Sequence, residues 1–373
     1  MSDVSEGADE YGAARVEVLE MIRKRPGMYV GSAGPRGLHH LLCGAADEAV
    51  NAVAAGRATR VEIVLLADGW VRVTDDGPGF PLQGDGDTPG LEDLFTRLPP
   101  FPPGPCGRER VLVGTWGVGP CVVNALSARL TAEVRRDGVR RVQEYAYGEP
   151  LAPPATVGPA DGTGTRITFR PDPGLFETLD FSFTGLEQRF RELAFLYPAM
   201  DITLTDRRPP GPERSVRLRY PDGLGDLFAH TVAQRELPVP TDAVRFAAED
   251  ARMGGTMEVI LGWSGTGPDH VLGFANGRST LDGGTAIEGL RDGVRAALDA
   301  RARERGGRQP LGLGLMAVVS VKLDSPVYEG PIRGRLAGDG VREAVGERVR
   351  EAVGAWLDGD AERARGVVAG SSR

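Results

Sequence analysis

The sequence predicts an α+β protein of two domains, and three observations support this prediction. Helical and strand patterns occur in separate groups, without the regular strand–helix alternation of a parallel α/β fold. Turn signals of the Asp-Gly type join strands directly at Asp68-Gly69 and Asp137-Gly138. A chain of 373 residues with 41% hydrophobic content can form two cores, and the composition changes where Pro and Arg crowd together at residues 207–213. We therefore expect a first domain up to about residue 220 and a second domain after it.

The first domain begins with the clearest helix of the chain, at residues 37–56, where apolar residues recur at helical spacing and Gly56 supplies a C-terminal stop. Alternating apolar residues then predict two strands at 60–66 and 70–74. The later elements are a helix that opens at the glycines of 114–119 and reaches 126, two strands around 137–138, a strand at 165–169, a helix at 185–196 and a strand at 201–205. The Gly- and Pro-rich stretch between about 77 and 107 is too long for a connector and predicts a lid or functional loop.

The second domain is predicted to contain strands at 257–263, 270–275 and 315–323. A helix begins at Thr285, whose hydroxyl is expected to cap it, with Glu288 completing a capping box. The final helix covers about 341–357, because Val341, Val345 and Val353 fall on one side of it.

Composition excludes several classes of protein. The net charge of −8 argues against broad, unassisted binding to DNA, although a local basic face stays open. Cys43, Cys106 and Cys121 fit neither a disulfide framework nor a zinc pattern, so we expect reduced thiols in a cytoplasmic protein. No apolar run is long enough to cross a membrane, and the polar first ten residues do not form a secretory signal.

Two glycine motifs carry the chemistry. The stretch Asp75-Asp76-Gly-Pro-Gly79-Phe-Pro81 follows a strand directly, where a carboxylate can accept a hydrogen bond from an exocyclic amine while the glycines let a flat base approach the backbone. The second motif, Gly114-Thr-Trp-Gly117-Val118-Gly119, enters a helix and can hold phosphate oxygens on backbone N–H groups. Each motif alone is weak, since the first is also a tight turn and many helices begin with glycines. The segment at 31–37 lacks the Gly-Lys-Ser/Thr ending of a Walker A loop.

In this order, and with Gly162-Thr-Gly-Thr165 before the next strand, the motifs resemble those of the GHKL ATPases. The resemblance is closer to the DNA gyrase B protein and its topoisomerase IV relative, and it covers nearly the whole chain from about Tyr11. It rests on stretches at residues 23–31 (RKRPGMYVG), 37–40 (GLHH), 122–127 (VVNALS), 191–196 (RELAFL), 283–285 (GGT) and 319–322 (VSVK). It implies a GHKL (Bergerat) ATP-binding α/β sandwich at 21–220, preceded by an N-terminal arm at 1–20 and followed at 221–373 by a transducer domain of ribosomal-protein-like fold.

The resemblance also implies ATP and Mg²⁺ as cofactors and assigns roles residue by residue. Asp75 would bind the adenine amine, Gly79 and Pro81 would line the base pocket, and Thr165 would help to hold the adenine. The phosphate-binding residues would be Gly114, Gly117, Val118 and Gly119. Arg333 stands where the family has a lysine that reaches the γ-phosphate, and it still offers a charged fork of donors.

The departures from the family lie on the first helix. Aligned without gaps, the glutamate that activates the attacking water is replaced by Gly44, and the asparagine that ligates magnesium by Glu48. Glu48 can still bind magnesium, because carboxylate oxygens suit a hard cation. His40, one turn before Gly44, is a candidate general base or phosphate ligand, with a histidine packed under the lid as the alternative. An alternative register would use Asp47 and Asn51, which keep the acid–amide spacing on another face.

The predicted lid lacks the family's Gly-Gly-Lys-Phe stretch, and no metal-binding TOPRIM domain follows the transducer, so we expect a truncated relative without DNA-cleaving apparatus. Three functions remain in competition. The first is a nucleotide-dependent homodimeric switch with weak or altered ATPase activity, which modulates a topoisomerase or protects one from an inhibitor. The second is an ATP-dependent enzyme, kinase- or ligase-like, that acts on a second small-molecule substrate, since loss of the water-activating glutamate suppresses hydrolysis. The third is a pseudo-ATPase scaffold.

Overall fold

We describe a computed structural model of the chain, in which residues 17–82, 84, 90–98, 119–236, 242–265, 267–304, 314–329 and 334–360 are described. The chain divides into two compact units, and the main division falls between Arg219 and Tyr220, with the short stretch Phe195–Pro198 grouped with the second unit. Among the described residues, no helix combines the length and the apolar character needed to cross a membrane.

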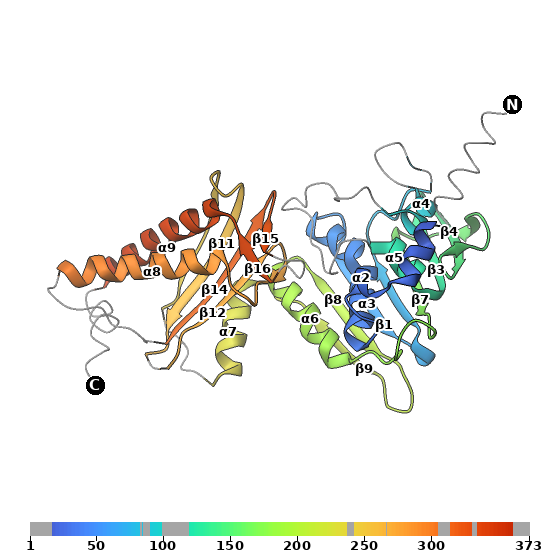
Figure 1. The fold of residues 1–373 in the computed structure, drawn as a ribbon, viewed down its shortest axis with the longest axis horizontal. Coiled ribbons are helices and arrows are strands. Elements are labelled where there is room, and N and C mark those ends of the chain that lie inside the picture. Colours follow the sequence, from blue (N-terminus) through green and yellow to red (C-terminus); the bar gives the residue numbers. More distant parts are fainter. Residues whose placement is uncertain are drawn as a thin grey trace. The chain divides into compact units, whose positions relative to one another are not determined.

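The first unit is built on a nine-stranded sheet with helices on one face (Figure 1). The strand order is β5-β4-β3-β7-β2-β1-β8-β9, and β6 pairs with β4. All neighbours are antiparallel except β1 and β8. The strands are β1 (Arg60–Leu65), β2 (Val71–Asp75), β3 (Ser127–Arg136), β4 (Val139–Ala146), β5 (Glu149–Pro150), β6 (Ala155–Pro159), β7 (Gly164–Pro171), β8 (Asp201–Asp206) and β9 (Arg214–Leu218). The helices are α2 (Gly27–Val30), α3 (Pro35–Ala54), α4 (Leu91–Thr96), α5 (Gly119–Ala125) and α6 (Phe183–Leu196), with a further helix at 17–24.

Local sequence explains most of these elements. The β1–β2 turn needs positive φ, and it has Asp68 at 55° and Gly69 at 77°. Helix α3 begins two residues before the predicted start, with Pro35 in its first turn, where a missing N–H costs nothing. The Asp137-Gly138 turn between β3 and β4 also has positive φ at both residues, as the sequence predicts.

Arg23 ties the helix at 17–24 to the rest of the first unit. Its Nη1 donates to the carbonyl oxygen of Ala125, at the end of α5, at 2.8 Å, and its Nη2 lies 2.5 Å from Oδ2 of Asp172. Its guanidinium carbon lies 5.1 Å from the centre of the Tyr147 ring. Because the side chains of Arg23 and Asp172 are only 25% and 10% exposed, water cannot replace these contacts fully.

Arg23→Ala is therefore expected to lower the free energy of unfolding by about 2 kcal/mol, since it leaves the largely buried carboxylate of Asp172 without its ion-pair partner. Chemical denaturation measures this effect. Lys24→Ala, at the next position, removes an exposed pair with Glu20 and should change stability little. Equal losses in both variants would contradict the structural role assigned to Arg23.

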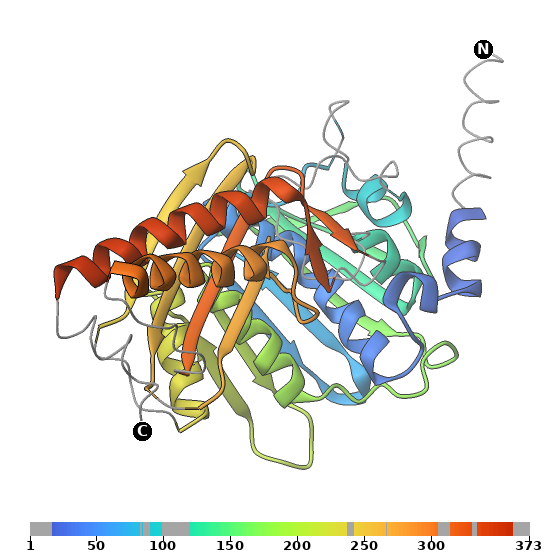
Figure 2. The same ribbon diagram turned by 60° about the vertical axis from the view of Figure 1, so that its left-hand side comes forward.

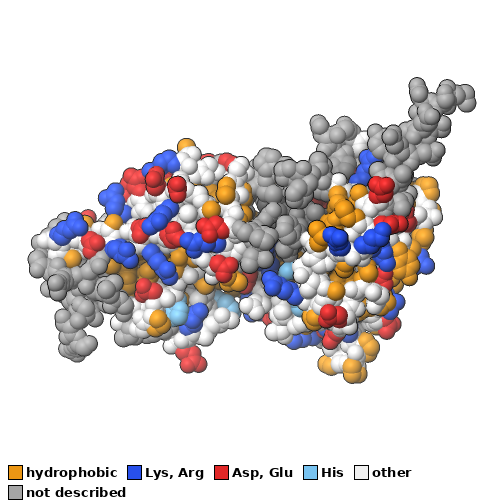
Figure 3. All heavy atoms as spheres, viewed as in Figure 1, with side chains coloured by type: hydrophobic (Ala, Val, Ile, Leu, Met, Phe, Trp, Pro, Cys, Tyr) orange, Lys and Arg blue, Asp and Glu red, His pale blue; other side chains and the backbone are white. Residues whose placement is uncertain are grey.

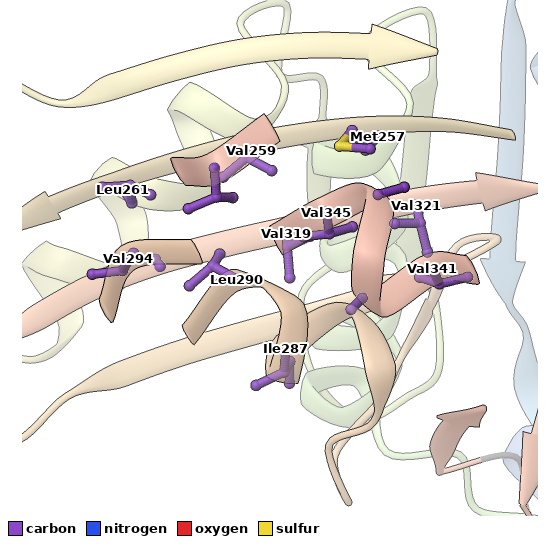
Figure 4. Packing of buried hydrophobic residues seen from close by; sticks show 14 of the residues in the cluster. Met257, Val259, Leu261, Ile287, Leu290, Val294, Val319, Val321, Val341 and Val345 are labelled. Carbon is purple, nitrogen blue, oxygen red and sulfur yellow. The ribbon is translucent and has the colours of Figure 1, made fainter. Parts of the chain in front are cut away.

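The second unit has a five-stranded sheet of order β10-β11-β14-β12-β13, a separate β15–β16 hairpin and, among the described residues, three helices. The strands are β10 (Val244–Asp250), β11 (Gly255–Trp263), β12 (His270–Ala275), β13 (Arg278–Ser279), β14 (Leu315–Leu323), β15 (Val327–Glu329) and β16 (Arg335–Ala337); the helices are α7 (Leu224–Gln234), α8 (Thr285–Glu304) and α9 (Asp339–Gly359). Helices α8 and α9 lie side by side along one face of the sheet (Figures 1 and 2). Alternate residues of β11 and β14 point towards them and form the core (Figure 4).

Helices α8 and α9 approach each other so closely that only glycine fits at their contact. A Cβ atom at Gly289 would lie 2.5 Å from the carbonyl oxygen of Arg342, and one at Gly293 would lie 2.4 Å from that of Gly346. The outer surfaces of both helices carry basic and acidic side chains interleaved (Figure 3). The two backbones are thus in direct contact beneath a mixed charged surface.

The capping box predicted at Thr285 is wrong. The Thr285 hydroxyl is buried without a hydrogen-bond partner among the described residues. The Glu288 carboxylate instead pairs with Arg335 of β16 at 2.5 Å and with Arg342 of α9 at 3.4 Å. The Glu288 carboxylate, which the local pattern assigned to the start of α8, therefore forms ion pairs with two arginines that are distant in the sequence.

Candidate functional site

Asp75 ends β2 and accepts two backbone hydrogen bonds on a single oxygen. Oδ1 receives the N–H of Gly77 at 2.8 Å and that of Thr165, on β7, at 3.3 Å. Oδ2 has no hydrogen-bond partner within the described part of the chain and is thus open to a donor. Burial raises the pKa of the Asp75 carboxyl above its ordinary value, and the charge of Asp76 adds to this, while the two backbone hydrogen bonds and the charge of Arg135 oppose it.

Two glycines bring the turn after Asp75 into backbone contact with the neighbouring strands. A Cβ at Gly164, directly before Thr165, would lie 2.2 Å from the carbonyl oxygen of Asp75. Gly79 has a φ of 73°, and a Cβ there would lie 2.7 Å from the carbonyl oxygen of Arg135. The structure thus brings Asp75, Gly79 and Thr165 together, while Pro81, two residues further, is half-buried.

Arg136 of β3 also contacts this turn, and the sequence did not predict it as a site residue. Its Nη1 donates to the carbonyl oxygen of Gly79 at 2.9 Å. The available signal was its position at the end of β3, just before the Asp137-Gly138 turn, which places it beside Gly79 only once the strand order is known.

One face of α3 carries Gly44, Glu48 and Ala52 at four-residue spacing. Among the described residues, the nearest atom to a Cβ at Gly44 would be Cγ2 of Val123, at 3.6 Å, which is an ordinary contact. At the other end, Cβ of Ala52 lies 3.6 Å from the position of a Cβ at Gly77. Glu48 lies one turn from each, so this face spans from α5 to the turn after Asp75.

The alternative register places its polar residues elsewhere. Asp47 and Asn51 are 2% and 5% exposed, and each precedes a residue of the Gly44 face by about 100° around the helix. Asp47 and Asn51 therefore lie on the buried side of α3, not on the face that carries Gly44.

The two adjacent histidines of α3 differ in environment. Nδ1 of His40 lies 2.9 Å from the carbonyl oxygen of Val30; since a carbonyl only accepts, Nδ1 is the donor in this hydrogen bond. Nε2 of His39 accepts the N–H of Ser182 at 2.9 Å, and its ring stacks on Phe181. Burial lowers the pKa of His39. His39 is thus held as a neutral packing residue, whereas the ring of His40 is oriented by the carbonyl oxygen of Val30.

The predicted phosphate site is described only at Gly119, which begins α5 with a φ of 40°. Gly114, Gly117, Val118 and Arg333 lie outside the described residues. Within the described ranges, no group of three or more His, Cys, Asp or Glu side chains could hold a metal ion. Glu48 is the carboxylate that shares the Gly44 face of α3, and carboxylate oxygens suit Mg²⁺.

The raised pKa of Asp75 predicts opposite effects of acid on two quantities. ATP affinity should fall as pH decreases through the folded pKa, above the ordinary 3.8, because the protonated carboxyl is a poorer acceptor for the adenine amine. Burial of the ionised group costs stability, so this cost disappears over the same range. Calorimetric titration from about pH 8 down to the lowest pH at which the protein stays folded measures the first effect; an affinity that stays constant while the Asp75 carboxyl is shown to become protonated would contradict this role.

A carboxylate fixed at a strand end beside two glycine turns, and a long helix covering the same sheet face, define a nucleotide-binding fold of the GHKL class. The family model for DNA gyrase B matches residues 223–372. The chain belongs to the DNA gyrase B family.

The novobiocin-resistant DNA gyrase B protein of Streptomyces niveus is 35% identical over 389 residues, covering 97% of this chain and 58% of that protein. The 43K ATPase domain of Thermus thermophilus gyrase B, solved with an aminocoumarin, is 32% identical with a TM-score of 0.76, over 95% of this chain and 93% of that one. The gyrase B protein of Myxococcus xanthus is 25% identical with a TM-score of 0.78, over 94% and 99%. The chain thus spans a little over half the length of the curated relative.

Proposed function

We propose that the chain binds ATP with its adenine amine on Oδ2 of Asp75 and its phosphates at the start of α5. The observation that carries this proposal is the Asp75 carboxylate, whose Oδ1 is fully occupied by backbone N–H groups while Oδ2 is left open. Gly79 and Gly164 support it, because side chains at either position would collide with the backbone that forms the pocket. Magnesium would be held by the phosphates and Glu48, and it would neutralise the charge of the triphosphate.

The second part of the proposal is that hydrolysis is weak. Gly44 occupies the position of the family's water-activating glutamate and offers no proton acceptor. Loss of general-base assistance typically costs roughly 10²–10⁴-fold in rate. ATP would then persist in the site, which suits a homodimeric switch that closes on nucleotide and reopens slowly. In this proposal residues 21–220 bind the nucleotide and residues 221–373 act as the transducer.

A second function is favoured by the lack of a side chain at Gly44, where a Cβ would meet only Val123 among the described residues, at an ordinary contact distance. In this function the acceptor group of another substrate would take the place of the attacking water beside the γ-phosphate. His40, one turn before Gly44 on α3 and oriented by the carbonyl oxygen of Val30, would then take the proton of that group. ATP consumption would depend on the added substrate.

Light scattering with and without ATP and Mg²⁺, combined with a phosphate-release assay, separates these functions. The switch predicts a dimer with nucleotide and slow release of phosphate. A protein that stays monomeric at saturating ATP would rule out the switch. If phosphate is released or nucleotide is consumed only when a small-molecule extract is added, the ATP-dependent enzyme is favoured. If the protein does not bind ATP, the pseudo-ATPase scaffold is the remaining function.

A further inference from the structure

The face of the first sheet that points away from the helices is basic at its centre. In the middle of the three central strands, β2, β7 and β3, the residues facing the helices are apolar and at most 4% exposed, as for Val73, Phe169 and Leu130. The outward positions alternate with them and carry arginine, threonine and one glutamate. No apolar residue stands among these outward positions.

Register places two arginines directly opposite each other on this face. Arg129 of β3 pairs with Arg170 of β7, and one step along the strands Arg72 of β2 faces Thr168 and, beyond it, Thr131. Like charges directly opposite each other destabilise an antiparallel pair. The Arg129–Arg170 pair therefore lowers the stability of the sheet, which would serve no purpose if this face had only a structural role.

These arginines also lack acidic partners. Neither Arg72 nor Arg129 forms an ion pair with any described residue, and Arg170 donates only to the carbonyl oxygen of Asp68, at 2.9 Å. At the sheet edge the situation is different: Arg217 of β9 pairs with Asp201 at 2.5 Å and Arg214 with Glu187 at 3.0 Å. Within the described residues, Arg72, Arg129 and Arg170 thus carry positive charge that no acidic side chain neutralises, in a chain whose net charge is −8.

The footprint of this basic face is limited to three strands. The next strands bring carboxylates to the same side, Glu62 of β1 opposite Thr74 and Glu144 of β4 opposite Thr131. Within the footprint, Glu133 is the single acid, and it pairs with Arg166 at 3.4 Å.

We propose that Arg72, Arg129 and Arg170, with the threonines between them, bind the phosphate backbone of a nucleic-acid duplex without reading its sequence. Guanidinium forks and threonine hydroxyls are the groups that contact phosphates. A protein partner would need apolar or aromatic anchors at its centre, and these outward positions have none. A single strand would need aromatic platforms for its bases, which are equally missing here.

Fluorescence anisotropy with a labelled DNA duplex of about 30 base pairs tests the proposal at several salt concentrations. Arg72→Gln/Arg129→Gln/Arg170→Gln should weaken binding at least about 10-fold at low salt and reduce the slope of log affinity against log salt by about 2.5. The double variant Arg72→Gln/Arg129→Gln keeps the contact of Arg170 with Asp68, and should reduce the slope by about 2.

The matched control is Arg207→Gln/Arg214→Gln/Arg217→Gln, which makes the same change in net charge by removing arginines that already have acidic partners. It should retain the affinity and slope of the parent protein. Equal losses of duplex affinity in both triple variants would show that only the overall charge matters and would overturn the proposal. The proposal is also overturned if the parent protein binds no duplex at low salt, or if it prefers an acidic peptide or a single strand of equal charge. Melting temperatures and ATP affinity, measured on the same samples, show that the variants are folded.

Discussion

Asp75→Asn is expected to lower the affinity for ATP by about 100-fold, equivalent to roughly 3 kcal/mol. The amide oxygen can still accept the N–H groups of Gly77 and Thr165, so the turn should keep its shape. The amide nitrogen, however, replaces Oδ2 with a donor that faces the donor amine of adenine. The loss therefore combines a missing hydrogen bond with an unpaired buried group. Isothermal titration with ATP and a non-hydrolysable analogue measures it.

Asp76→Asn is the matched control, because it makes the same substitution one residue away. The Asp76 carboxylate accepts from the N–H groups of Thr59 and Arg60 at 2.8 and 2.9 Å. Its substitution should leave ATP affinity unchanged. If the two variants bind ATP equally well, Asp75 is not the adenine contact and the proposed site is wrong.

Gly44→Glu is expected to increase ATP turnover by roughly 10²–10⁴-fold if the rest of the site is intact, since it restores a carboxylate where the family activates water. Among the described residues, the Cβ of the new side chain would make only an ordinary contact, with Val123 at 3.6 Å. Replacement of a helical glycine should also raise the melting temperature slightly. A coupled phosphate-release assay at saturating ATP measures the turnover.

Gly44→Gln separates chemistry from shape. The glutamine has the same size and the same effect on the helix, but it cannot take a proton from water. Turnover should therefore rise only in the glutamate variant. Equal rates in both variants, with ATP bound, would show that Gly44 is not the position of the missing base.

Short-range patterns predicted much of this fold because local physics decides those elements. The alternation in β1 and β2 and the positive φ at Asp68 and Gly69 follow from neighbouring residues alone. The contact of Asp75 with Thr165 came from family resemblance, since these residues lie 90 positions apart and meet only through the pairing of β2 with β7.

Long-range competition explains what the sequence could not predict. Glu288 has the correct spacing for a capping box, but Arg335 and Arg342 bind it from other elements. The basic face escaped detection for a related reason: Arg72, Arg129 and Arg170 are scattered along the chain and become neighbours only through strand register. Net charge hides such a face, because it sums over surfaces that no single partner contacts.

The glycine contact between α8 and α9 has a mechanical consequence. Sliding or rolling of one helix along the other would drive carbonyl oxygens against the opposing backbone at Gly289 and Gly293. The pair should therefore behave as a single stiff beam, and any displacement of one end of it must carry the other end along.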